Sequence, residues 1–326
     1  MNLRDPNVRR WAMRLFKVAL LALVAWGIHR TLWQAWQNLQ DEHWNVSQLR
    51  PGWLLAAGAC YLLGQLGPGR FWWKLLHLLG QPARPLETLR AYYIGHVGKY
   101  APGKALVIVI RAGLLRAGGT TATAATVAVF FETLTTMSVG AAMAVIILVA
   151  WFRDDPRVIG AAVLLYLIVS GPTNPNVFRR LVRFTGAGKL DPAMAERLVH
   201  IRYGSLVGCW LQIASGWLLM GLSLWATAHA AGFEAQTGVF KEIAFCTAAV
   251  AMSVVGGFLS FLPGGLGVRE AALLTLLTPI YHADGALVAS LVSRLVWIVA
   301  ELAAAGVLYL SIRWPRRNDI NGPPAH

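Results

Sequence analysis

The chain has 326 residues, of which 56% are hydrophobic and only 13% are charged. A soluble domain carries roughly 25% charged residues, so this composition excludes an ordinary soluble fold and predicts an all-α polytopic membrane protein. The net charge of +14 does not indicate nucleic-acid binding, because the basic residues flank the apolar stretches. In that position they act as topology signals and contact anionic lipid headgroups.

Six apolar segments are predicted to cross the membrane, since about 20 apolar helical residues span a bilayer core. They are residues 12–34, 52–70, 119–151, 157–171, 203–231 and 284–312. The first segment resembles a signal peptide but is followed by no small-residue cleavage site, so we expect an uncleaved span. Between the fourth and fifth segments, residues 172–202 are expected to form a basic cytoplasmic connector that lies on anionic lipid.

Two further apolar segments, 86–117 and 239–281, are interrupted by proline and glycine, which break helices. The breaks contain Pro102 and Gly103 in the first segment, and Pro263, Gly264, Gly265 and Gly267 in the second. We predict that both segments are re-entrant helical hairpins. Irregular backbone at membrane depth is tolerated only where protein buries it or a watery cavity surrounds it, so the hairpins imply a cavity.

The basic residues support this topology. With the N-terminus in the cytoplasm, the inside segments hold 18 Lys and Arg, the outside loops hold five, and the hairpins and last span hold the other six. This bias fits the positive-inside rule and predicts a multi-pass inner-membrane protein with both termini in the cytoplasm. The chain then forms one membrane domain, 1–326, in which residues 52–151 and 203–312 are inverted repeats. Transporters with such repeats bind substrate near the midplane.

Charged residues within the membrane cost about 2.5 to 3.5 kcal/mol each on insertion scales, so they usually face a cavity or one another. The candidates for lipid-headgroup or cavity contacts are Lys99, Lys104, Arg111, Glu132, Arg269, Glu270, Arg294 and Glu301.

Several of these residues have a structural alternative. Arg269 is expected to hold a lipid phosphate, or else to form an ion pair with Glu270 that braces the hairpin. Lys99 and Lys104 bind a headgroup as point charges or extend to the cytoplasmic interface. Glu132 is expected to be a counter-ion or a proton site.

Arg294 and Glu301 lie two turns apart on one helical face. Glu301 is expected to pair with Arg269 or Arg111, or to take part in a buried pair that fixes helix register.

The breaks carry two recognisable motifs. The stretch from Leu262 to Ala272, LPGGLGVREAA, resembles the signature of the lysylphosphatidylglycerol synthase transmembrane-region family, also called flippase-like domain proteins. The stretch GKYAPGK at 98–104, followed by Arg111, resembles the first motif of that family. The spacing of the motifs fits a match over the whole chain.

The resemblance implies a membrane domain that moves or handles polar lipids, such as aminoacylated phosphatidylglycerol, hopanoid precursors or polyprenyl-linked sugars. It carries the family's motif positions over to Lys99, Pro102, Gly103, Lys104, Arg111, Glu132, Pro263, Gly264, Gly265, Gly267, Arg269 and Glu270. The chain departs from the full-length synthases because no acyltransferase-like domain follows the last span. Lipid aminoacylation by this chain alone is therefore not expected.

We expect a lipid translocase without cofactor or metal, in which the phosphate of an anionic or aminoacylated phospholipid, or of a polyprenyl or hopanoid lipid, meets Arg111, Arg269 and Lys104. Two alternatives stay open: a non-transporting subunit that presents lipid to a partner enzyme, and a secondary transporter of a small anion. We do not expect an enzyme, because the sequence has no nucleophile or metal constellation. A membrane-enzyme partner and a homo-oligomer are both compatible with the sequence.

Overall fold

The computed structural model describes residues 49–100, 105–151, 156–198, 203–234, 237–260, 265 and 267–311, together with six positions between 22 and 37. These residues form helices and connecting loops, without a strand among them. Within the described part of the chain, five helices are long and apolar enough to cross a membrane. The protein is therefore an all-α polytopic membrane protein, as its composition predicts.

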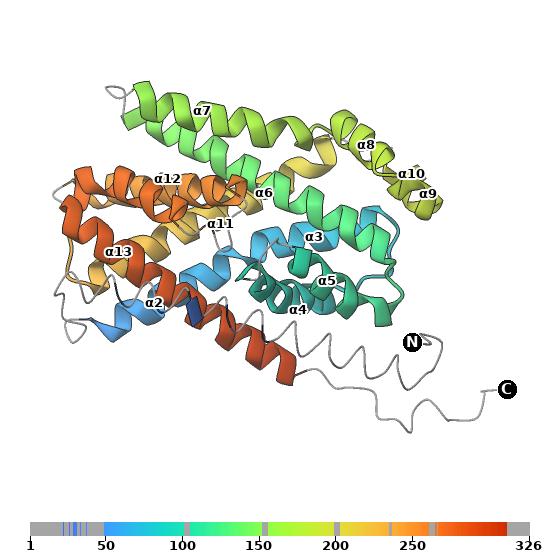
Figure 1. Cartoon of the computed structure of the whole chain (residues 1–326), viewed down its shortest axis with the longest axis horizontal. Helices are drawn as coiled ribbons and strands as arrows, with labels where there is room; N and C mark the ends of the chain where they lie inside the picture. Colours follow the sequence, from blue (N-terminus) through green and yellow to red (C-terminus); the bar gives the residue numbers. More distant parts are fainter. Residues whose placement is uncertain are drawn as a thin grey trace.

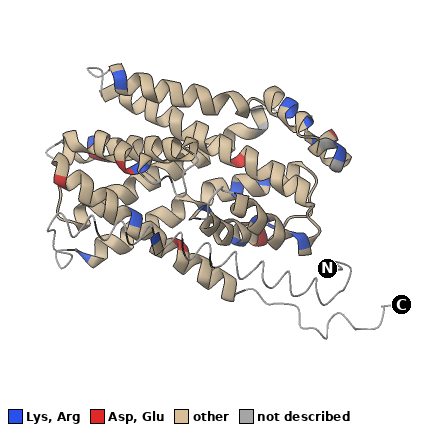
Figure 2. Cartoon of the chain, in the orientation of Figure 1, with Lys and Arg blue, Asp and Glu red and all other residues tan. Residues whose placement is uncertain are grey.

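From residue 49 onward, the described part of the first half contains two helices in sequence, α2 (Pro51–Gly64) and α3 (Leu66–Leu78). The chain then turns back through α4 (Pro85–His96), the short 3-10 helix η2 (Val97–Tyr100) and α5 (Ala105–Leu115). After η3 (Arg116–Gly118), the long α6 (Ala122–Trp151) runs the length of the molecule (Figure 1). Its only charged residue is Glu132, so the rest of the helix carries no charged side chain (Figure 2).

After α6 the chain continues through one shorter helix and, beyond a connector of short helices, through three long ones. α7 (Pro156–Ser170) packs along α6 (Figure 1). α11 (Tyr203–Ala230) is followed by α12 (Val239–Leu259) and α13 (Val268–Leu310). α13 is two helices joined at a kink, because His282 has φ 57° and ψ 175°. α12 and α13 pack against each other and against α11.

The connector between the halves contains η4 (Gly171–Thr173), α8 (Pro175–Phe184), α9 (Ala187–Leu190) and α10 (Pro192–Leu198). α8 is strongly amphipathic: Phe178 and Val182 are buried, whereas three arginines of the helix lie outside this buried face. The basic connector expected from the sequence is thus a run of short helices beside the end of α7 (Figure 1).

Several predicted boundaries match the helices closely. The predicted spans 119–151, 157–171 and 203–231 correspond to α6, α7 and α11, and the last predicted span, 284–312, corresponds to the part of α13 that follows the kink. The predicted first span, 12–34, lies almost entirely outside the described residues.

The predicted span 52–70 differs from the structure. In the structure this helical segment continues to Leu78 and consists of two helices, α2 and α3, which meet at Gln65. The physical reason lies in the sequence around the break. Pro68 has no N–H to donate to the residue four positions earlier. Gly64 and Gly67 lie against the backbone of α11, where a Cβ on either residue would come within 3 Å of a carbonyl oxygen.

The two predicted hairpins correspond to pairs of packed helices. α4 and α5 form the first, and α12 and the first part of α13 form the second. Pro102, Gly103, Pro263 and Gly264 lie outside the described residues, while Gly265 and Gly267 have φ of 70° and 81°, which favours glycine. α12 is long enough by itself to cross a membrane. Re-entrance of both hairpins stays a prediction.

Candidate functional site

A cavity of about 220 Å³ lies where the two predicted hairpins meet. Its walls come from α2 to α6 in the first half of the chain and from α11, α12 and α13 in the second. Pockets for drug-sized ligands measure roughly 300 to 1,000 Å³, so this cavity suits a headgroup better than a whole two-chain lipid.

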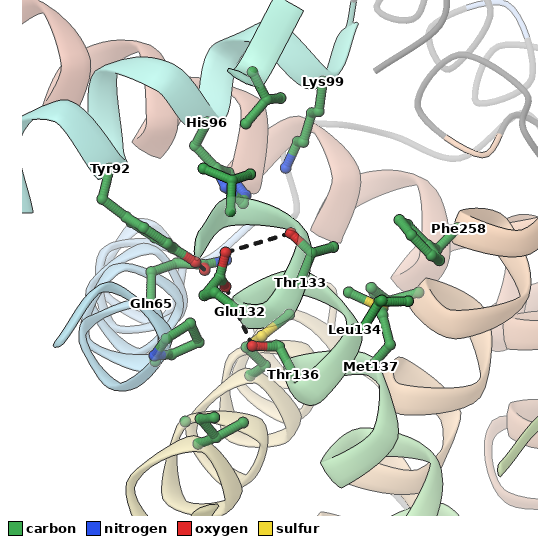
Figure 3. Close-up of a pocket in the computed structure, with 18 of the residues that line it drawn as sticks. Gln65, Tyr92, His96, Lys99, Glu132, Thr133, Leu134, Thr136, Met137 and Phe258 are labelled. Carbon is green, nitrogen blue, oxygen red and sulfur yellow. Dashed lines mark hydrogen bonds between the residues drawn. The ribbon is translucent and has the colours of Figure 1, made fainter. Parts of the chain in front are cut away.

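The lining of the cavity has a polar side and an apolar side, and the labelled side chains separate in this way in Figure 3. The polar group is Gln65, Tyr92, His96, Lys99 and Glu132, and the apolar group is Leu134, Met137 and Phe258. Such an arrangement suits an amphipathic ligand whose charged end faces the polar group.

Arg111 and Glu132 form a buried ion pair at the polar side. The guanidinium Nη1 of Arg111 lies 3.0 Å from Glu132 Oε2, and both residues are almost inaccessible to solvent. Thr133 and Thr136 donate hydrogen bonds to the same carboxylate (Figure 3). The Arg111 guanidinium also lies 4.0 Å from the centre of the Tyr92 ring. The positive charge of Arg111 is thus already balanced by protein groups.

Lys99 and Glu301 form a second pair across the two halves of the chain. The ammonium of Lys99 donates to Glu301 Oε1, and the hydroxyls of Tyr61 and Tyr100 donate to the same carboxylate. His96 Nε2 is 3.7 Å from Glu301 Oε1. A carboxylate with this many donors is well satisfied despite its burial.

The structure thereby revises an expected pairing. Glu301 is paired with Lys99, and neither Arg269 nor Arg111 is its partner. Arg294 is paired with Glu270, across the kink of α13.

Arg269 differs from these cations. It lines the cavity and is half-buried, yet among the described residues it has no carboxylate within ion-pair distance. Its guanidinium lies 5.3 Å from the centre of the Trp297 ring, which is a cation–π contact. The Arg269 charge is therefore open to an anionic ligand.

Glycines make room for both cavity arginines. A Cβ at Gly257 would lie 2.5 Å from Arg269 Cγ, and one at Gly265 would lie 2.8 Å from the same atom. A Cβ at Gly95 would lie 2.4 Å from Arg111 Cγ. Real Cβ contacts are not this short, so each arginine side chain packs onto a backbone without a side chain of its own.

Four of the eight predicted site residues line the cavity, namely Lys99, Arg111, Glu132 and Arg269. Glu301 lies behind Lys99, and the Glu270–Arg294 pair lies beside the cavity without lining it. Lys104 lies outside the described residues.

The family model described as "Lysylphosphatidylglycerol synthase TM region" matches residues 14–305. The chain belongs to this family. The match includes both predicted hairpins and every residue that lines the cavity, in agreement with the resemblance of the two motifs. A comparison with curated proteins finds no match.

In this lysylphosphatidylglycerol synthase TM-region protein, the sequence motifs alone miss the aromatic side chains that contact the charged groups. These are Tyr61, Trp72, Tyr92 and Trp297. They carry no charge and lie in ordinary apolar runs, so they could not be told apart there from packing residues. Gly95 and Gly257 are missed for a similar reason, since each is one glycine among 32 in the chain.

Proposed function

We propose that the protein is a flippase-like lipid translocase whose cavity binds the anionic headgroup of a membrane lipid. The acyl chains stay in the bilayer during binding. The headgroup phosphate is held by Arg269, while the two buried ion pairs shape the polar wall. The sequence led us to expect that the phosphate meets Arg111, Arg269 and Lys104. Arg111 is paired with Glu132, and Lys104 lies outside the described residues.

The charge balance around the cavity carries the proposal. Arg111 is balanced by Glu132, Lys99 by Glu301 and Arg294 by Glu270. Arg269 then leaves one unbalanced positive charge in the described part of the site. A charge without a partner is costly in the low-dielectric surrounding of the membrane. Entry of a monoanionic phosphate group beside half-buried Arg269 is therefore favoured.

A side opening favours lipid over a small soluble anion. Phe130 lines the cavity and is 52% exposed on the outer surface of α6, so the cavity wall reaches the surface of a helix long enough to cross the membrane. A transporter of small anions needs a cavity that is closed toward the bilayer, whereas acyl chains need such an exit.

The setting of this function follows the expectations from the sequence. We place the protein in the inner membrane with both termini in the cytoplasm. It acts as a transporter and not as an enzyme, without a cofactor, and its ligands are lipids. The alternative of a subunit that presents lipid to a partner enzyme differs in one measurable respect: the purified chain would not move lipid by itself.

Replacement of Arg269 tests the proposal. Purified protein in proteoliposomes with a fluorescent anionic phospholipid should exchange that lipid between leaflets. A hydrogen bond to a charged group contributes about 1.5 to 3 kcal/mol, so Arg269→Ala should slow the exchange by roughly 10- to 150-fold. Arg269→Lys, which keeps the charge but not the fork of donors, should retain part of the rate.

Arg84→Ala is the matched control, because the Arg84 side chain is 81% exposed and does not line the cavity. It should leave the exchange unchanged. Exchange by Arg269→Ala at the wild-type rate would remove Arg269 from the function. An inactive wild-type chain that regains exchange only with a partner enzyme would favour the lipid-presenting subunit.

A further inference from the structure

One face of α8, in the connector between the two halves of the chain, is apolar and exposed. The helix has ten residues, PNVFRRLVRF. Three of its apolar side chains form this face: Val177 is 40% exposed, Leu181 43% and Phe184 90%. We call these three residues the apolar strip, because positions i, i+4 and i+7 lie on one side of a helix. None of them lines the cavity, so the proposed headgroup site does not account for them.

The apolar strip lies between two other strips of side chains on the same helix. On one side of it are the buried residues Phe178 and Val182, which face the protein. On the other side is a polar strip with the same i, i+4, i+7 spacing. Its members are all exposed, and they are Asn176, Arg180 and Arg183. An exposed apolar strip flanked by polar side chains is typical of an interaction surface.

Contacts with the rest of the protein fix the rotation of α8. The ring of Phe178 lies 4.5 Å from the ring of Phe131 on α6, and Phe131 in turn packs against Phe71 of α3. At the start of α8, the side chain of Asn174 accepts a hydrogen bond from the N–H of Asn176. The helix is thus held by its buried side, and the apolar strip stays on the outside.

α8 begins where a helix that can cross the membrane ends. The candidate span Pro156–Thr173 consists of α7 and η4, and Asn174 alone separates it from α8. Phe131, on which α8 packs, is in the third turn of α6. α8 continues beyond the end of α7 and carries basic residues along its length (Figures 1 and 2). The apolar strip therefore lies near the level at which hydrocarbon gives way to water.

The charges of α8 suit an anionic membrane surface. The helix contains three arginines and no acidic residue. The ion pairs formed among the described residues include neither Arg180 nor Arg183. Basic residues beside a membrane are attracted to anionic lipids, and the guanidinium group matches the geometry of a phosphate. Both arginines are thus available to lipid phosphates.

A partner protein is the alternative occupant of this face, but the size of the strip argues against it. A stable interface buries about 800 Å² on each partner, whereas the apolar strip consists of three side chains on a short helix. Helices that lie in the membrane interface combine an apolar face with Lys and Arg on the polar face. We infer that α8 is such a helix: the apolar strip inserts into the adjoining leaflet, and Arg180 and Arg183 bind the phosphates of anionic lipids there.

Fluorescence quenching in nanodiscs tests the insertion of α8, with the full chain in a cysteine-free background. A bimane label at Leu181→Cys should be quenched by phospholipid that carries a doxyl group near the top of its acyl chain. The reason is that an interfacial helix buries its apolar face about 5 to 10 Å into the boundary of headgroups and acyl chains. Asn176→Cys, on the polar strip, is the matched control. Its label should be quenched less by doxyl lipid and more by iodide in the water.

The same label measures the preference for anionic lipid. In nanodiscs of phosphatidylserine and phosphatidylcholine, the doxyl group is placed on one lipid and then on the other. The Leu181→Cys label should be quenched more by the anionic lipid, because one basic residue near the surface gives roughly a fivefold preference. Arg180→Gln combined with Arg183→Gln should remove the difference between the two lipids.

Two results would overturn the inference. Equal quenching of the two labels, with iodide reaching both, would exclude insertion and favour a partner protein on this face. Equal quenching of the Leu181→Cys label by the two lipids would exclude binding of anionic lipid. Val177→Cys is a second label position on the apolar strip and should repeat the result of Leu181→Cys. Transport is not measured and Arg269 is unchanged, so the outcome is separate from that of the translocase proposal.

Discussion

Glu301 is the residue on which the polar wall of the cavity depends most. Its carboxylate accepts hydrogen bonds from Lys99, Tyr61 and Tyr100, and it is only 3% exposed. These donors come from α2 and η2 in the first half of the chain, whereas Glu301 comes from α13 in the second. One side chain thus joins both halves beside the proposed headgroup site.

Removal of the Glu301 charge should destabilise the protein strongly. Glu301→Gln leaves the Lys99 ammonium without its counter-charge, and breaking one partner of a buried pair costs about 3 to 5 kcal/mol. Unfolding in mixed detergent micelles measures this loss. Glu87→Gln is the control, because Glu87 forms an exposed pair with Arg84 and should change stability by less than about 1 kcal/mol. Equal losses of stability in Glu301→Gln and Glu87→Gln would contradict the role of Glu301 in a buried ion pair.

At the scale of elements, α2 and α3 pack against α11 by direct backbone contact. A Cβ at Gly216 of α11 would lie 2.4 Å from the carbonyl oxygen of Gly64, and a Cβ at Gly67 would lie 2.4 Å from that of Gln212. Small residues that let helices approach closely are typical of membrane interfaces. This crossing connects the first half of the cavity wall to the second.

Gly216→Ala should therefore weaken the protein, because a backbone oxygen cannot move aside as a flexible side chain does. Overpacking of this kind costs typically 1 to 3 kcal/mol. Gly208→Ala on the same helix meets nothing within 4 Å, so it should be neutral or stabilise by up to about 1 kcal/mol through helix propensity. The same unfolding measurement compares both variants. Unchanged stability of Gly216→Ala would contradict the direct backbone contact between α2 and α11.

The positions of most helices could be predicted from the sequence, because apolar runs and proline–glycine breaks are local features. For example, the last span is predicted to begin at residue 284, and the structure has the kink of α13 two residues earlier, at His282. The pairing of charges could not be predicted with equal success. Lys99 and Glu301 are 202 residues apart, and whether two such side chains meet depends on the rotation of each helix about its axis.

At the scale of the whole molecule, hydrogen bonds between segments that are far apart in the sequence identify two ends of the helix assembly. At one end, Thr121 at the start of α6 bonds to Gln81 after α3 and to Asp191 in the connector. At the other end, the N–H of Arg50 before α2 donates to the carbonyl of Ala230 at the end of α11. The first end coincides with the segments predicted to be cytoplasmic, and the second coincides with segments predicted to be outside.

Single cysteines at the two ends test this orientation. In a cysteine-free background, Glu234→Cys in the loop after α11 should react with a membrane-impermeant maleimide added to spheroplasts. Arg183→Cys on α8 should react only after the membrane is permeabilised. Both residues are exposed, so a difference in labelling reports the side of the membrane. The reverse pattern would contradict an inside connector and the positive-inside assignment.

The most direct test of the account is a cryo-electron microscopy structure of the protein in nanodiscs that contain anionic phospholipid. We predict density for a phosphate within hydrogen-bond distance of Arg269, with acyl-chain density leaving past Phe130. A cavity without lipid, in which Arg269 is paired with a carboxylate of the chain, would contradict the account.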